Sequence, residues 1–165
     1  MANLLDSGAR RNFDSGAVRD VVEGKGRCDL LPLAVVARLI SKEGAVANEV
    51  LLNIDLFVQH GTIESLYHAI YAYCIEASKD IYTVVLEAAK QFEDGAKKYD
   101  DRNWEKGIPL HWFIDSGVRH YLKYRRGDTD EPHDRAFLWN IFCAIWTFEN
   151  LPYLRDLPFV QKGDL

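Results

Sequence analysis

The sequence predicts an all-α fold, a helical bundle of about five to six helices with a loop-rich N-terminal arm. Apolar residues recur at helical spacing from Leu30 onward, and prolines and glycines stand where helices should begin and end. We find no convincing strand-like alternation of apolar and polar residues, and no internal repeat. With 165 residues, 48% of them hydrophobic, the chain can bury one core and needs no second domain.

Three regions follow from composition along the chain. Residues 1–29 are rich in Gly, Ser, Asp and Arg, so we expect a loop-like arm that is either disordered or folded over a site. Residues 30–150 carry the helical pattern and are expected to form a single all-α domain. Residues 151–165, with two prolines, are expected to form a tail.

Start and stop signals delimit the helices of this domain. The first is expected between Pro32 and Gly44, and a later one begins at Pro109 and stops at Gly127, after basic residues in its last turn. The remaining expected helices cover 46–59, 62–78, 79–99 and 132–149.

Bulk charge and cysteine usage restrict the classes of partner and location. The formal net charge of -5 argues against a nucleic-acid polymer as partner, so an anionic ligand must meet cations gathered locally. The chain has no apolar run long enough for a membrane span and no signal-peptide core. Three cysteines without CxxC spacing indicate structural thiols in a reducing compartment, which favours a cytoplasmic location.

The segment Phe92–Gly107 is the most unusual part of the sequence. It gathers acids, lysines, an arginine, an asparagine and a tryptophan around the end of a helix. Acids can hold a divalent cation, cations can bind phosphate, and an indole can cover a base. This mixture therefore predicts a polyanion site and suggests nucleotide chemistry.

Helical spacing separates the acids of the 79–99 helix. Glu93 falls between Tyr82 and Leu86 on the apolar arc, whereas Glu87 and Asp94 share the opposite side with Lys98. An inward carboxylate needs a partner, since an unpaired buried charge is strongly unfavourable. For Glu93 this leaves two alternatives, a buried ion pair with Arg119 or a lysine, and a metal ion.

The helix 109–126 places His111, Asp115, Arg119, Lys123 and Arg126 on one arc. This arc is either a solvated face with an Asp115–Arg119 i,i+4 pair, or one wall of a cleft against the 101–107 loop. In the second case Asp115 would face a cation, and Arg119 and Lys123 would face phosphate. His120 lies at the edge of the apolar side, where a histidine is usually a satisfied core residue.

The helix 132–149 is apolar on nearly every side and should be central or in a subunit interface. His133, Asn140 and Thr147 form one polar stripe along it, which either stitches a close helix contact or faces a ligand cavity. The dipeptide His133-Asp134, with His120 upstream and Asp156 downstream, also invites comparison with HD-type phosphohydrolases, although the two side chains should point about 100° apart on a helix.

Ordered sequence blocks over roughly half of the chain resemble the phage-associated dATP/dGTP diphosphohydrolase family, which is distantly similar to the all-α, MazG-like nucleotide pyrophosphatases. The blocks are SGA at 7–9, EGKGRCDLLPL at 23–33, FEDGAKKYDDRNWEKGIPL at 92–110, IDSGVRHYLKYRRGDTDEPHDRAFLWN at 114–140 and AIWTFE at 144–149. Two departures stand out. A helical insertion, 41–87, separates the second and third blocks, and the ExxE and ExxD pairs usual in MazG-like enzymes are missing from the expected places.

The resemblance implies that the 30–150 domain binds a nucleotide and cleaves a purine deoxynucleoside triphosphate to monophosphate and pyrophosphate, with Mg²⁺ or Mn²⁺ as cofactor. It would act in the host cytoplasm if phage-encoded. Glu93 and Asp115 are then expected as principal metal ligands and catalytic residues, with His120, His133 or Asp134 completing the metal shell or relaying a proton. The expected base-binding residues are Asn103, Trp104 and Asn140. The candidate phosphate contacts are Lys25, Arg27, Lys97, Arg102, Lys106, Arg119 and Lys123.

Two other functions stay open from the sequence. One is a non-hydrolytic nucleotide-binding protein on the same scaffold, such as an anti-defence sponge that sequesters a nucleotide signal. The missing ExxE pair favours this alternative. The other is a helical interaction module, in which the charged block at 92–107 would be superfluous. A homo-oligomer is expected because the 132–149 and 46–78 helices carry more apolar surface than one small bundle buries.

Overall fold

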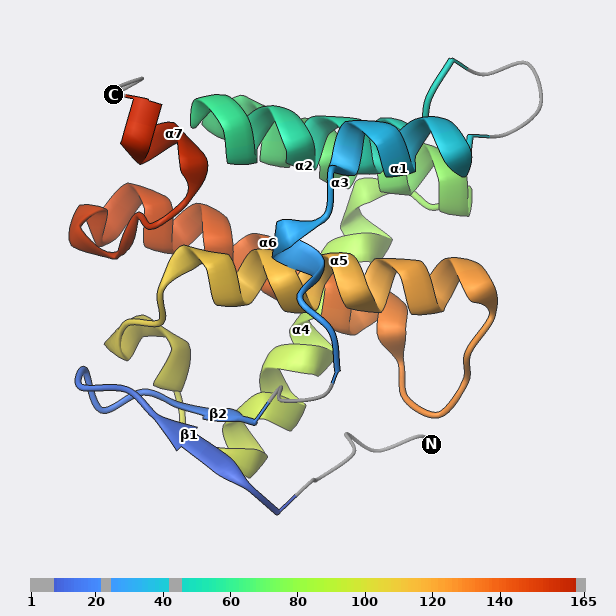
Figure 1. Cartoon of the computed structure of the whole chain (residues 1–165). Helices are drawn as coiled ribbons and strands as arrows, with labels where there is room; N and C mark the ends of the chain where they lie inside the picture. Colours follow the sequence, from blue (N-terminus) through green and yellow to red (C-terminus); the bar gives the residue numbers. More distant parts are fainter. Residues whose placement is uncertain (1–7, 22–24, 42–45, 163–165) are drawn as a thin grey trace.

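Two antiparallel helices form the centre of the molecule, α5 (Leu110–Arg126) and α6 (His133–Asn150) (Figure 1). The computed structural model describes residues 8–21, 25–41 and 46–162. Apolar side chains surround α6, so it is buried on nearly all sides, as its sequence predicts. Gly117 lets α5 approach α6 closely, since a Cβ there would lie 3.3 Å from Cβ of Asn140. The central position of the 132–149 helix is confirmed.

Three helices cover one side of this pair: α1 (Leu33–Leu39), α2 (Glu49–His60) and α3 (Ile63–Ala77) (Figure 1). Asn48 caps α2 by accepting a hydrogen bond from the Leu51 amide at 2.9 Å, and it also donates to the Tyr121 hydroxyl at 2.7 Å. The short helix α7 (Pro158–Lys162) returns to the same side and buries Phe159 against Phe57. The predicted end of the first helix at Gly44 lies outside the described residues.

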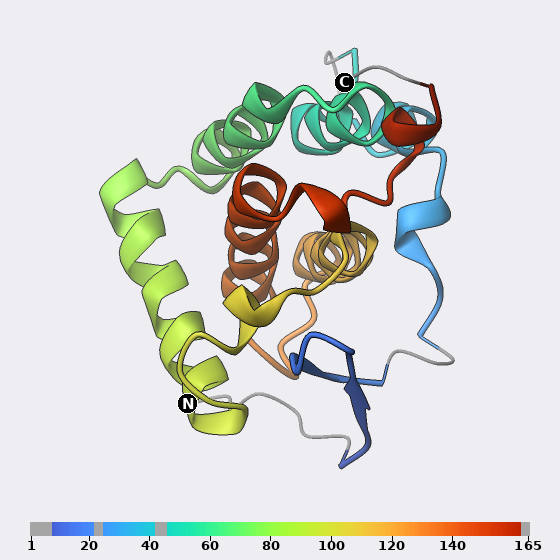
Figure 2. The ribbon, with the colours of Figure 1, turned by 90° about the vertical axis from the view of Figure 1, so that its left-hand side faces the viewer.

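The helix α4 (Ile81–Lys98) lies on the opposite side of α6 from α5 (Figure 2). Only a narrow stripe of it is covered, with Val84, Ala88 and Gln91 buried. Tyr82 and Leu86, which the sequence placed on the buried arc, are 80% and 67% exposed. The predicted buried arc was wrong because α4 contacts its neighbours along one edge only and leaves part of its apolar face exposed.

The N-terminal arm contains an antiparallel hairpin that the sequence did not predict. Strands β1 (Arg10–Asn12) and β2 (Val18–Asp20) pair with Arg11 opposite Arg19. Three residues are too short to show the alternation by which a strand is recognised. The hairpin is held to the body by Asn103, which accepts from the Val18 amide at 3.0 Å and donates to its carbonyl at 2.9 Å.

The remaining described segments agree with the predicted class. Three single 3₁₀ turns, η1 (Cys28–Leu30), η2 (Asn103–Lys106) and η3 (Pro152–Leu154), join the seven α-helices of the described residues, so the all-α fold is confirmed. Gly127 ends α5 with φ of 89°, as predicted. All three cysteines are free thiols. Within the described ranges no helix combines the length and apolarity needed to cross a membrane.

Candidate functional site

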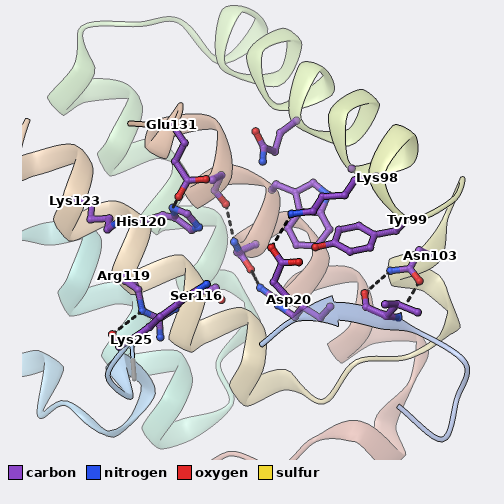
Figure 3. A pocket seen from close by; sticks show the side chains of 17 residues that line it. Asp20, Lys25, Lys98, Tyr99, Asn103, Ser116, Arg119, His120, Lys123 and Glu131 are labelled. Atoms are coloured by element: carbon purple, nitrogen blue, oxygen red, sulfur yellow. Dashed lines mark hydrogen bonds and ion pairs between the residues drawn. The ribbon is translucent and has the colours of Figure 1, made fainter. Parts of the chain in front are cut away.

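A cavity of about 220 Å³ opens where β2, α4, α5 and α6 meet (Figure 3). Its wall combines charged side chains with aromatic and amide groups. The cations are Arg19, Lys25, Lys98, Arg119 and Lys123, and the acids are Asp20 and Glu131. Five cations against two acids give a local positive excess in a protein whose formal net charge is -5. A cavity of this charge attracts polyanions.

Arg19, from the hairpin, lies at the wall of this cavity and is only 9% exposed. Its Nη2 atom donates to Oδ1 of Asn140 at 2.5 Å, whereas Nη1 has no hydrogen-bond partner among the described residues. Burial lowers the pKa of Arg19 to about 10, so the guanidinium is still charged at neutral pH. A buried cation with an unmet donor is the kind of group that an anionic ligand satisfies.

The hairpin contributes an acid as well. Asp20 accepts from Lys98 Nζ at 2.7 Å (Figure 3) and from Arg10 Nη1 at 2.8 Å, so its charge is already balanced. Arg19, Asp20 and Lys98 were not among the site residues predicted from the sequence. The only signal available was that an arm rich in arginine and aspartate could fold over a site.

Aromatic and amide side chains line the part of the cavity near α4. Tyr99 and Trp139 supply ring surface. Burial, followed by the contact with Asp20, raises the pKa of Tyr99, so its phenol is protonated at neutral pH. Gln91 is 5% exposed, and its Oε1 atom has no partner among the described residues. An amide with an unused acceptor beside two rings suits the recognition of a base.

His120 and Glu131 lie beside Lys123 (Figure 3), and His133 completes a cluster of three possible metal ligands with them. The Nδ1 atoms of His120 and His133 are 2.9 Å apart, and Oε1 of Glu131 lies 3.7 Å and 3.5 Å from them. Burial, and secondarily His133, lowers the pKa of His120 to about 3, so this ring is neutral at physiological pH. Nε2 of His133 contacts Asp130 at 2.7 Å, and this contact lowers the pKa of Asp130 to about 2. Imidazole nitrogens and a carboxylate oxygen that converge in this way are a donor set that fits a divalent metal.

Glu131 was not among the predicted site residues. It stands two residues before His133 and lies 3.5 Å from that histidine. Of the four predicted metal ligands, Glu93, Asp115, His133 and Asp134, only His133 belongs to this cluster.

Asp115 is fully buried beneath the cavity wall instead of facing a cleft. It accepts from the Cys28 amide at 2.6 Å and forms an ion pair with Arg119. Arg119 in turn donates to the Gly26 carbonyl at 2.7 Å. The two residues therefore attach the 26–28 segment to α5, and the predicted i,i+4 pair exists, but with Asp115 fully buried and Arg119 partly buried.

Glu93 does not point inward, and that prediction was wrong. Its side chain is 65% exposed and pairs with Lys97 along the helix surface. The proposed partner Arg119 is engaged by Asp115. Because α4 buries Val84, Ala88 and Gln91, the position of Glu93 lies outside the covered stripe.

The remaining predicted site residues are dispersed. Asp134 lies near Lys79 at 3.5 Å, and Asp156 accepts from the His111 amide at 3.0 Å, so the HD-type set of acids and histidines is not assembled. Trp104 packs against Phe92 and Trp146 and does not line the 220 Å³ cavity. The outlying cations each have an acidic neighbour: Arg27 with Asp29, Lys97 with Glu93, Arg102 with Glu105, and Lys106 with Asp100 at 3.7 Å.

Other predicted residues do meet at the cavity. Lys25, Asn103, Arg119, His120, Lys123 and Asn140 line its wall. The stripe of His133, Asn140 and Thr147 is buried throughout, and of its members only Asn140 lines the cavity. Asn140 also donates to the Ala136 carbonyl at 2.8 Å, so the stripe combines the two interpretations that the sequence left open.

Comparison with known proteins gives one match. The model of the family described as dATP/dGTP diphosphohydrolase, N-terminal, matches residues 80–156, just under half of the chain, from α4 to η3. The match includes the lining residues of the cavity from Gln91 to Asn140 and the histidine cluster, but not the hairpin or Lys25. No curated protein and no solved structure matches. Over residues 80–156 the chain is therefore similar to the dATP/dGTP diphosphohydrolase N-terminal family.

Proposed function

We propose that the chain hydrolyses purine deoxynucleoside triphosphates to the monophosphate and pyrophosphate in this cavity, as part of phage nucleotide metabolism. The family supports a diphosphohydrolase. The observation that carries the proposal is the cationic cavity with its buried Arg19, since a triphosphate is the polyanion that such a wall would bind.

The residues divide the cavity into two parts. Lys25, Arg119 and Lys123 lie on the same side as His120, and Tyr99 and Asn103 lie toward α4 and the hairpin (Figure 3). Trp139 also lines the cavity. We infer that the triphosphate binds at the first part and the base at the second. The rings would stack on the base, and the cations would hold the phosphates.

The reaction adds the oxygen of one water molecule to the α phosphorus while the bond from that phosphorus to the αβ-bridging oxygen breaks. Negative charge then grows on the departing pyrophosphate, and the water protons pass to the products and the solvent. Lys123 and Arg119 would stabilise that charge because they are already in place before the reaction.

The family's chemistry implies a divalent cation, and the donor atoms of His120, Glu131 and His133 fit one. A cation held there would offset phosphate charge and lower the pKa of a bound water. The Asp130 contact keeps the His133 ring in one orientation.

A non-hydrolytic nucleotide-binding protein is the second candidate, and one observation favours it. Among the residues that the structure describes, two carboxylates line the cavity, Asp20 and Glu131, and Asp20 is already paired with Lys98 and Arg10. A wall rich in cations and poor in available acids is sufficient for binding a nucleotide, but leaves few groups for catalysis.

The test compares turnover and binding in the same protein. The full chain is incubated with Mn²⁺ or Mg²⁺ and each dNTP, pyrophosphate release is assayed, and nucleotide binding is measured by calorimetry. Lys123→Ala is expected to lower kcat/KM by about tenfold or more, which corresponds to about 1.4 kcal/mol. Lys97→Ala, which removes an exposed cation outside the cavity, is the matched control and should leave kcat/KM unchanged.

The outcomes separate the candidates. Stoichiometric binding without pyrophosphate release would reject hydrolysis and favour the second candidate. Neither binding nor turnover with any dNTP would reject both and leave a helical interaction module.

A further inference from the structure

We propose that His120, Glu131 and His133 form a site for one divalent transition metal ion of the Mn²⁺ to Zn²⁺ series, and not for Mg²⁺. The inference deepens the proposed function by naming the ion class, and rests on it only for the use of the ion in hydrolysis. It begins from the three donor atoms, which lie 2.9, 3.5 and 3.7 Å from one another. Donors bound to one such ion at about 2.0–2.1 Å lie roughly 3–3.5 Å apart, so a small adjustment would bring all three into contact with it.

The donor types decide the class of ion. Two of the three are imidazole nitrogens, which bind Zn²⁺, Co²⁺, Fe²⁺ and Mn²⁺ much better than Mg²⁺. Mg²⁺ prefers an octahedron of oxygens and gives up its water reluctantly. A magnesium ion would therefore find one carboxylate here, whereas a transition metal finds three ligands.

An outer carboxylate orients one of the rings. Asp130 Oδ1 lies 2.7 Å from Nε2 of His133, and an ionised acceptor at this nitrogen favours a proton on Nε2. The lone pair of His133 is then on Nδ1, the atom that faces His120 and Glu131. A carboxylate, a histidine and a metal in sequence are a recurrent arrangement in metal sites.

The site also has access to the ligand cavity. His120 and Glu131 line the cavity, whereas His133 is 2% exposed behind them. Three protein ligands leave at least one position of the ion for water or a phosphate oxygen. Lys123, also on the cavity wall, is held near this loop by Asp130 at 3.4 Å.

Two other accounts of the same residues are weaker. In the first, His120 simply donates from Nδ1 to His133, and Glu131 is a bystander, although its oxygen lies within 3.7 Å of both nitrogens. In the second, the ion binds Asp128, Asp130 and His133 on the outer side of the ring. Arg126 already binds the Asp128 carboxylate, with Nε to Oδ1 at 2.7 Å, so one of the two acids of that set is already paired.

The experiment measures metal content and ligand field without any nucleotide. The full chain is stripped with chelator, equilibrated with Zn²⁺ or Co²⁺ in excess Mg²⁺, and analysed by mass spectrometry of the metal and by visible absorption of Co²⁺. We expect about one ion per chain and Co²⁺ bands of a nitrogen and oxygen site. His120→Gln and Glu131→Gln should weaken binding more than about 100-fold, and Asp130→Asn by about tenfold to 100-fold.

Asp128→Asn is the matched control, because it removes a neighbouring acid of the same loop and should retain the ion. Retention of helical circular dichroism shows that each variant is folded. The Co²⁺ spectrum of the unmodified chain gives a test that needs no variant. Absence of stoichiometric metal, equal competition by Mg²⁺, or loss of the ion in Asp128→Asn with retention in Glu131→Gln would overturn the assignment.

The result is distinguishable from that of the hydrolysis assay. A chain that binds Zn²⁺ at this cluster but releases no pyrophosphate supports the metal site and rejects hydrolysis. A chain that hydrolyses dNTPs with Mg²⁺ while the cluster stays empty supports hydrolysis and rejects the metal site.

Discussion

Arg19 and Asn140, separated by 121 positions in sequence, are joined by a 2.5 Å hydrogen bond between Nη2 and Oδ1. The bond fixes one end of a guanidinium that lies over the rings of Phe113 and Trp139, at 5.1 and 5.6 Å from their centroids. The other end, Nη1, has no partner among the described residues. Arg19 is thus oriented by α5 and α6 while one donor atom stays available.

Replacement of Arg19 tests its role as a phosphate contact. Arg19→Met should weaken nucleotide binding by about tenfold or more in calorimetry, because a charge-assisted hydrogen bond is lost in a desolvated site. Arg11→Met is the control, since Arg11 pairs with Arg19 across the hairpin but lies over Trp112 and not on the cavity wall. Equal affinities of the two variants would show that Arg19 serves only the fold.

Gln91 is expected to select the base. If its Oε1 atom accepts from an exocyclic amino group, dGTP should be bound better than dITP, which lacks that group. Gln91→Leu, similar in volume, should remove this difference and leave the helical content unchanged. A preference that survives in Gln91→Leu would assign base selection to another residue, such as Asn103.

Asp115 and Glu93, the two acids expected to act together, should differ in their effect on stability. Asp115→Asn should lower the free energy of unfolding by about 3–5 kcal/mol, because it leaves the partly buried Arg119 without its counter-ion. Glu93→Gln should leave the urea midpoint unchanged, since the Glu93–Lys97 pair is exposed. Unchanged metal-dependent turnover in Glu93→Gln would also confirm that Glu93 is not the catalytic acid.

The cap of α4 predicts a pH dependence of stability. Asp80 accepts from the Thr83 hydroxyl and amide, which lowers its pKa below the ordinary value of 3.8. Since the folded state holds the ionised form, this stabilisation is complete above about pH 3.8 and is lost as pH falls through the lowered pKa. Denaturation at pH 7 and at pH 3 should therefore show a larger loss of stability for the unmodified chain than for Asp80→Asn.

The predicted homo-oligomer now depends on different residues. The apolar face of α6 is buried within the chain, so it cannot serve the interface. Ile75 on α3 and Tyr82 and Leu86 on α4 are 82%, 80% and 67% exposed. We expect light scattering to give at least twice the mass of one chain, and Leu86→Lys to reduce it; a monomeric mass for the unmodified chain would contradict the prediction.

Local signals in the sequence were sufficient for the helices but not for the site. A helix boundary or a buried helix depends on residues within that helix, so both could be predicted. Examples are the start and end of α5 at Pro109 and Gly127, and the burial of the 132–149 helix. Whether Glu93 is covered depends on how far α4 stands from α6, and the hairpin position of Arg19 depends on Asn103, 84 residues away. Such contacts between distant segments leave no periodic pattern in the sequence.

The two hydrogen bonds between Asn103 and the Val18 backbone bring residues from outside the family segment to the cavity wall. Residues 80–156, by which the family is recognised, hold the histidines and most of the cations, but the hairpin supplies Arg19 and Asp20 from outside that segment. The segment that matches the family and the set of residues that lines the cavity therefore have different boundaries in this chain. A fragment limited to residues 80–156 would still match the family but would lack the hairpin side of the cavity wall. In a protein that shares this segment but has another N-terminal arm, a different set of residues would close the cavity.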